Sequence, residues 1–179
     1  MRSVHRAQRS RSLSWLFLVA LVIATVASCG KVGETAAASN EVTAATRAVK
    51  AALHRLMTEY PRLETELDPL RAAEPKRAAT RIRAAVVPLF DDVAKSLEAA
   101  AAAEDRYVAV AGDHPAPSDV AAIEGIRKNA AIHHRQATSY ADVRDGYTKE
   151  ATLLDAGTIP PAQARAIIEA RVARLQHLD

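Results

Sequence analysis

Hydrophobic residues recur every three or four positions along most of the chain after residue 40. One set lies seven residues apart at Val42, Val49, Leu56, Leu63 and Leu70, and a companion set lies at Thr46, Leu53, Tyr60 and Leu67. This spacing places both sets on one face of a helix. Ser39 or Asn40 suits the N-cap position, because either side chain can accept a bond from the first turn. The pattern predicts a long first helix from about residue 41.

Prolines mark the expected end of this helix. Pro61 lies inside the heptad pattern, so we expect a kink or a brief break there. Pro69 and Pro75 can each stand at the first position of a new helix. The chain is therefore predicted to reverse direction between residues 68 and 76.

Three further helices follow from the same periodicity. A second helix is predicted over about 76–111, with a possible bend at Pro88. A third runs from Ser118 or Asp119 to about residue 156, where Gly157 ends it. The inward positions of the second helix are Ile82, Val86, Leu89, Val93, Leu97, Ala100 and Val108, and those of the third include Ile123, Ile126, Ala130, His133, Ala137, Tyr140, Tyr147, Ala151 and Leu154.

A fourth, shorter helix opens at Pro160-Pro161, with Ile167, Ile168, Val172, Leu175 and Leu178 inward. No segment alternates polar and β-branched residues with period two, so strands are not expected. The sequence predicts an all-α, up-and-down helical bundle of three long helices and one short C-terminal helix.

The segment before residue 29 has a different character. Residues 1–14 carry four arginines and no acid, and residues 15–27 are apolar apart from Thr25. A cationic start followed by an apolar run of this length is typical of a signal peptide. Thirteen helical residues reach about 20 Å, against roughly 30 Å of bilayer hydrocarbon, which favours cleavage over a permanent transmembrane anchor.

The apolar run ends in Val26-Ala27-Ser28-Cys29, and Cys29 is the single cysteine of the chain. This sequence resembles the lipobox of bacterial lipoproteins, in which an aliphatic residue and two small residues precede a cysteine. The resemblance implies cleavage between Ser28 and Cys29 and lipid attachment to the Cys29 sulfur. Ordinary signal-peptide cleavage, with Cys29 as a free thiol, is the alternative.

The predicted organisation is a signal peptide over 1–28, a lipidated cysteine and flexible tether over 29–40, and a helical bundle domain over 41–179. The whole chain has a net charge of +3 and a pI near 9.2. Removal of residues 1–28 takes away four of 24 basic residues and leaves 20 against 21 acids, a net charge of −1. The basic pI therefore belongs to the export signal, and a nucleic-acid partner is not expected.

Few residues form patterns that suggest catalysis or metal binding. Histidines lack partners three or four positions away that could complete a metal site on one helix face, so no metal or other cofactor is expected. His133 lies on the apolar stripe and is expected to be a core side chain bonded to a tyrosine, which makes His133 and Tyr140 the candidate polar core site. The serines do not lie in a nucleophile elbow, and no glycine-rich phosphate loop occurs.

Charged clusters are interpreted as solvated helix faces. The adjacent carboxylates Asp91-Asp92 and Glu104-Asp105 point to different parts of a helix, which does not suit paired acid–base chemistry. The densest basic patch consists of Lys76, Arg77, Arg81 and Arg83. In a lipid-anchored protein this patch could contact anionic headgroups, although a solvated face is the simpler interpretation.

The sequence therefore predicts a lipid-anchored protein on the periplasmic or outer face of a cell or outer membrane. We expect a non-enzymatic interaction module with another envelope protein as its partner. Ile159-Pro-Pro-Ala-Gln163 resembles part of the motif of Spy- and CpxP-type periplasmic chaperones, so an envelope stress chaperone is an alternative. A metal-binding or enzymatic bundle centred on His133 is a third.

Overall fold

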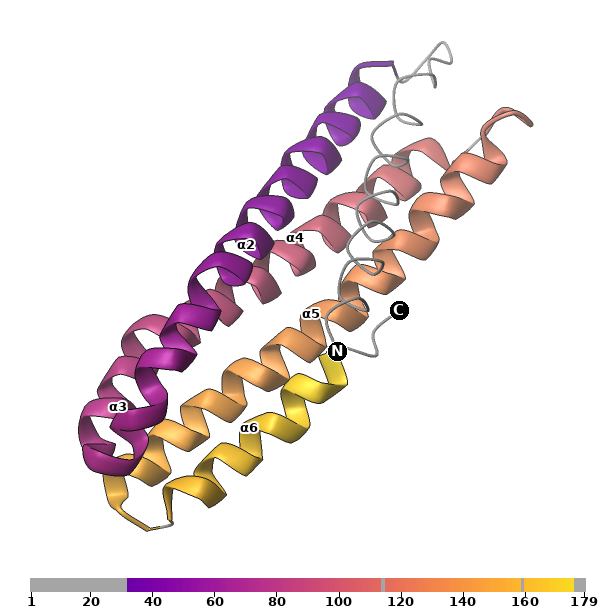
Figure 1. Cartoon of the computed structure of the whole chain (residues 1–179). Coiled ribbons are helices and arrows are strands. Elements are labelled where there is room, and N and C mark those ends of the chain that lie inside the picture. Colours follow the sequence, from indigo (N-terminus) through magenta and orange to yellow (C-terminus); the bar gives the residue numbers. More distant parts are fainter. Residues whose placement is uncertain (1–31, 114, 159, 176–179) are drawn as a thin grey trace, which may run out of the picture.

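The computed structural model describes residues 32–113, 115–158 and 160–175 (Figure 1). Its elements are α2 (Val32–Ala73), α3 (Pro75–Arg81), the π-helical η2 (Ile82–Val86), α4 (Val87–Ala111), α5 (Val120–Ala156) and α6 (Pro161–Leu175). The predicted signal peptide, the cleavage site and Cys29 lie outside the described residues, as do His114 and Leu178. Within the described part there is no strand, and the predicted all-α bundle of three long helices and one short C-terminal helix is confirmed.

The three long helices run side by side, with α4 packed against both α2 and α5 (Figure 1). The upper end of the bundle holds the start of α2, the end of α4 and the start of α5. The lower end holds the turn from α2 into α3, the end of α5 and the start of α6. Because α6 has only 15 residues, it covers α5 over the lower part of the bundle alone.

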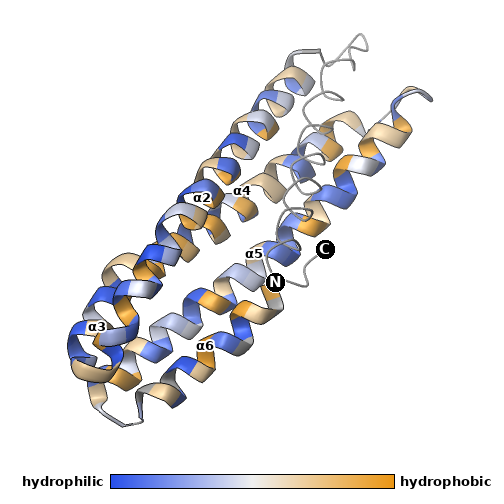
Figure 2. Ribbon diagram, viewed as in Figure 1, coloured by the Kyte–Doolittle hydropathy of each residue, from blue (hydrophilic) through white to orange (hydrophobic). Residues whose placement is uncertain are grey.

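The core follows the predicted apolar stripes, whose hydrophobic residues recur in orange along the helices in Figure 2. The buried side chains of the main cluster include Val49, Leu56, Leu63, Leu67, Ile82, Val86, Leu89, Val93, Leu97, Tyr147 and Leu154. A second cluster near the upper end contains Ala38, Val42, Ala103, Tyr107 and Ile126. Many core positions are alanine, which lets neighbouring helices approach closely.

The predicted start of the first helix is wrong. Residues 32–40 belong to α2, so a tether does not extend over them and neither Ser39 nor Asn40 is an N-cap. Glu34 in the first turn interacts favourably with the helix dipole. The alanines at 36–38 are strong helix formers, and Ala38 is buried against the second cluster.

The prolines have three different roles. Pro61 and Pro69 lie inside α2, so the prediction that Pro69 could start a helix is wrong. The chain reverses at Glu74, within the predicted window, and Pro75 stands at the start of α3 as expected. Before Pro88 the helix widens into the π turn η2, in which the Val87 N–H bonds to the Ile82 carbonyl. Pro88 has no N–H and its ring crowds the preceding turn, which the wider turn relieves.

The remaining helix ends agree with the sequence. Asp119 precedes α5, and Gly157 ends it in the left-handed conformation with φ of 64°. Only glycine adopts this conformation without steric cost, so the glycine stops the helix. None of the helices in the described part has an apolar stretch long enough to span a bilayer.

Candidate functional site

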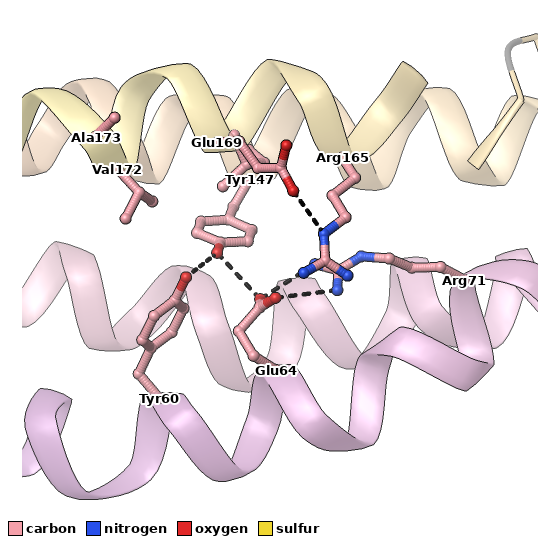
Figure 3. A pocket seen from close by; sticks show the side chains of 9 residues that line it. Tyr60, Glu64, Arg71, Tyr147, Arg165, Glu169, Val172 and Ala173 are labelled. Atoms are coloured by element: carbon pink, nitrogen blue, oxygen red, sulfur yellow. Dashed lines mark hydrogen bonds and ion pairs between the residues drawn. The ribbon is translucent and has the colours of Figure 1, made fainter. Parts of the chain in front are cut away.

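A network of buried and partly buried polar side chains joins α2 to α5 (Figure 3). Arg71 lies at its centre, and its side chain is only 4% exposed. The Arg71 guanidinium donates from Nε to Oε1 of Glu150 at 2.7 Å and from both Nη atoms to Glu64 at 3.1 Å. Glu150 is fully buried, so Arg71 provides the charge that compensates its carboxylate.

Two tyrosine hydroxyls extend the network. Tyr147 donates to Oε1 of Glu64 at 3.0 Å, and the hydroxyls of Tyr60 and Tyr147 are 2.7 Å apart. Because the single proton of Tyr147 points to the carboxylate, the Tyr60 hydroxyl donates to Tyr147. Both rings pack on Phe90, with ring centroids 5.3 Å away for Tyr60 and 5.4 Å for Tyr147.

Burial governs the ionisation of these groups. It raises the pKa of the Tyr147 and Tyr60 hydroxyls, so both stay protonated donors at neutral pH. Burial also raises the pKa of the Glu150 carboxyl, although the Arg71 guanidinium opposes this shift. For Arg71, burial lowers the pKa of the guanidinium, but its bonds to Glu64 and Glu150 outweigh that effect and raise it overall.

A pocket of about 210 Å³ opens beside the network and is closed on one side by α6. Ile168 and Val172 form its apolar wall, while Arg165 and Glu169 bond to each other at 2.9 Å at its edge. Arg165 also pairs with Asp68 of α2. The pair of Arg165 with Asp68 therefore joins α6 to α2 beside the pocket, while the bond to Glu169 lies within α6.

The structure places the two predicted core-site residues apart. His133 bonds through Nδ1 to Oε2 of Glu104 at 2.8 Å, whereas Tyr140 packs its ring near Phe90 with centroids 6.3 Å apart. The partner of His133 is thus a carboxylate of α4 and not the predicted tyrosine. Position explains the difference, because residues 133 and 140 are two turns apart on α5 while Glu104 faces His133 across the α4–α5 contact.

Glu104 also corrects the prediction of a solvated face. Its side chain is 1% exposed, and its second carboxylate oxygen is buried with no hydrogen-bond partner among the described residues. The neighbouring Asp105 is exposed as predicted and bonds to His134. Asp91 and Asp92 form ion pairs with Arg144 and Arg55, respectively, at the edge of the α4 surface. Among the described residues, no cluster of three or more potential ligands could hold a metal ion.

His134 gives a testable pH dependence. Its Nδ1 and Nε2 atoms lie 3.1 Å from the carboxylates of Glu98 and Asp105, and the bonds to Asp105 and then Glu98 raise the pKa of the ring above its ordinary value. Because the pKa of His134 is higher in the folded than in the unfolded chain, the charged ring stabilises the fold at pH values below the unfolded pKa near 6.5. This contribution is lost as the pH rises through the pKa of the folded state.

We expect the midpoint of urea unfolding to fall slightly between pH 6 and pH 8. The effect should stay below about 1 kcal/mol because these pairs are exposed. The His134→Gln variant should lose the part of this pH dependence that belongs to the ring. A ring pKa at or below 6.5 in the folded protein, measured by NMR titration, would contradict the assignment.

Most of the polar network was missed from the sequence, although a signal was present. Tyr60 and Tyr147 were predicted on the stripes, but Arg71 and Glu150 were not singled out. Arg71 lies four residues after Leu67, and Glu150 lies three after Tyr147 and four before Leu154. Charged residues of opposite sign at inward-facing positions of two helices are the pattern that could have indicated a buried pair.

Comparison of the chain with protein-family models, with curated proteins and with solved structures found no match. The functional argument therefore depends on the chain's own residues.

Proposed function

We propose that this protein is a lipid-anchored lipoprotein of the bacterial cell envelope that acts as a non-enzymatic helical interaction module. The observation that carries the proposal is the position of α2. The described part of this helix begins at Val32, three residues after the lipobox cysteine Cys29. Three residues extend at most about 10 Å, so a lipid on Cys29 would hold the upper end of the bundle at the membrane surface.

The polar network supports an interaction module rather than an enzyme. Arg71, Glu64, Glu150 and Tyr147 bond to one another and thereby join α2 to α5. Groups used in this way set the register and packing of a bundle. The exposed faces of the helices are then the surfaces that meet a partner, which we propose is another protein of the envelope.

One experiment tests both parts of this proposal. A photoreactive amino acid is placed in the full chain at Ala73 at the lower end or at Ala121 near the upper end, and both residues are exposed. In cells, we expect membrane-bound, acyl-labelled protein and a discrete crosslinked adduct with another protein from at least one position. The Cys29→Ser variant should lose acyl labelling and accumulate as an unprocessed precursor.

The outcomes separate the two parts. If Cys29→Ser is still processed and released, the lipobox interpretation is wrong. If the wild-type chain is lipidated but neither position gives an adduct, the interaction function is contradicted while the anchor stands.

A further inference from the structure

A shallow groove lies at the lower end of the bundle, between the last turns of α2 and the first turns of α3. Its volume is about 760 Å³. Leu70 and Ala84 contribute apolar surface to it. Lys76, Arg77 and Arg81 line it with positive charge against the single carboxylate of Glu66, so the lining carries a net positive charge. The groove therefore combines a small apolar surface with three cations on one short helix.

These cations are held only weakly by the protein itself. Arg77 bonds to Glu74 at 3.2 Å with its side chain 70% exposed, and Arg81 bonds to Glu66 at 3.0 Å with both side chains about half exposed. Exposed pairs of this kind contribute about 1 kcal/mol or less, so a competing anion can displace them. Lys76 is exposed and has no ion pair within the described residues.

The groove also lies at the end of the bundle opposite the first residues of α2, which follow the expected lipid anchor in the sequence (Figure 1). The 42 residues of α2 extend about 60 Å from Val32 to the turn at Glu74. When the bundle stands upright, the groove is out of reach of the headgroups of the membrane that holds Cys29. This placement makes contact between the basic patch and that membrane a poor explanation of the charge.

We infer that this groove binds an acidic segment of another envelope protein. This inference rests on the proposed interaction function and names its surface and the chemistry of its partner. A concave groove with apolar surface fits an extended or helical segment better than a flat membrane. Carboxylates of such a segment would replace Glu74 and Glu66 as partners of Arg77 and Arg81, and an apolar side chain would cover Leu70.

The test measures binding of a defined acidic peptide to the full lipidated chain in detergent micelles. The probe is a fluorescein-labelled peptide of six glutamates around two central leucines, and binding is followed by fluorescence anisotropy. Lys76→Glu with Arg77→Glu reverses two charges of the groove. We expect this variant to weaken binding at least about tenfold and the wild-type affinity to fall as salt is added.

The matched control is Arg127→Glu with Lys128→Glu on α5. The control also reverses one arginine and one lysine, but near the upper end of the bundle. Arg127 bonds to Glu124 three residues before it, just as Arg77 bonds to Glu74. Circular dichroism shows whether both variants are folded. The control should bind the peptide within about twofold of wild type.

Three results would overturn the inference. The first is that wild type does not bind the peptide, and the second is that both variants bind it as tightly as wild type. The third is that both variants lose affinity equally, which would indicate attraction by the overall charge of the protein. A parallel measurement compares binding to phosphatidylglycerol vesicles. If wild type binds the vesicles more strongly than the peptide, and only the groove variant loses this binding, the inference is wrong and the groove binds a second membrane instead. Failure of the proposed function is distinguishable, because it appears in the crosslinking and acyl-labelling experiment.

Discussion

Replacing Arg71 by alanine should lower the free energy of unfolding by about 3–5 kcal/mol. The variant leaves the carboxylate of Glu150 fully buried without its cation, and this is the situation in which breaking a buried ion pair is most costly. Glu64 and Asp68 lose a donor as well. For a chain of this size the thermal midpoint should fall on the order of 10 °C, measured by circular dichroism at 222 nm.

The pH dependence identifies the cause of this loss. Without Arg71, only the weaker attraction of Arg165 opposes the upward shift that burial imposes on the pKa of Glu150, so the carboxyl becomes protonated at higher pH than in wild type. A neutral Glu150 costs less to bury, so the destabilisation should be smaller at pH 5 than at pH 8. The sign follows from linkage, because a group whose folded pKa is raised favours the folded state at low pH.

Two further variants separate charge from simple loss of packing. Arg55→Ala removes an arginine whose side chain is 53% exposed and which bonds to Glu59 and Asp92. Its effect should stay within about 1 kcal/mol. The double variant Arg71→Met with Glu150→Leu should recover most of the stability, because no buried charge remains. A double variant as unstable as Arg71→Ala would show that the ion pair is not the source of the effect.

Replacing Tyr147 by alanine should cost about 3–5 kcal/mol, measured by urea unfolding. The ring is fully buried and stacks on Phe90, so its removal leaves a large cavity in the main core. The hydroxyl also donates to Glu64, which holds Arg71. Packing and the polar network are therefore lost together.

The Tyr147→Phe variant divides this effect into its two parts. The ring stays in place while the bond to Glu64 and the acceptor for Tyr60 are removed. We expect a loss of about 1–2 kcal/mol, typical of buried groups that lose one hydrogen-bond partner. If Tyr147→Phe is as unstable as Tyr147→Ala, the ring contributes little and the proposed packing role is wrong.

Periodicity was sufficient to predict the helices and their inward faces. The positions Val42, Val49, Leu56 and Leu63 repeat every seven residues and are buried, because a helix returns to the same face at that interval. Gly157 and Pro75 mark helix ends as expected, since both act through local backbone geometry. Local rules failed at residues 32–40, whose glycine and polar residues predicted a flexible tether. These residues are helical, and Ala38 packs in the second cluster.

The candidate site depended on contacts between helices. Arg71 and Glu150 are 79 residues apart, and Glu104 and His133 are 29 apart. The pattern of one helix does not predict which charged residue of a neighbouring helix will face a given side chain. That pairing depends on the rotation and stagger of the packed helices. Hence Glu104 was predicted to lie on a solvated face, and His133 was given a tyrosine partner.

The sequence by itself determined the helical class of this protein, its turns, the inward stripes and the expectation of an export and lipidation signal. Each of these depends on residues close together in the chain. Only the tertiary structure decided that Arg71, Glu64, Glu150 and Tyr147 form one network between two helices. It also decided that Lys76, Arg77 and Arg81 line a groove at the end of the bundle opposite Val32. The physical reason is that burial and charge pairing are properties of the packed helices, set by which faces meet, whereas periodicity is a property of each helix alone.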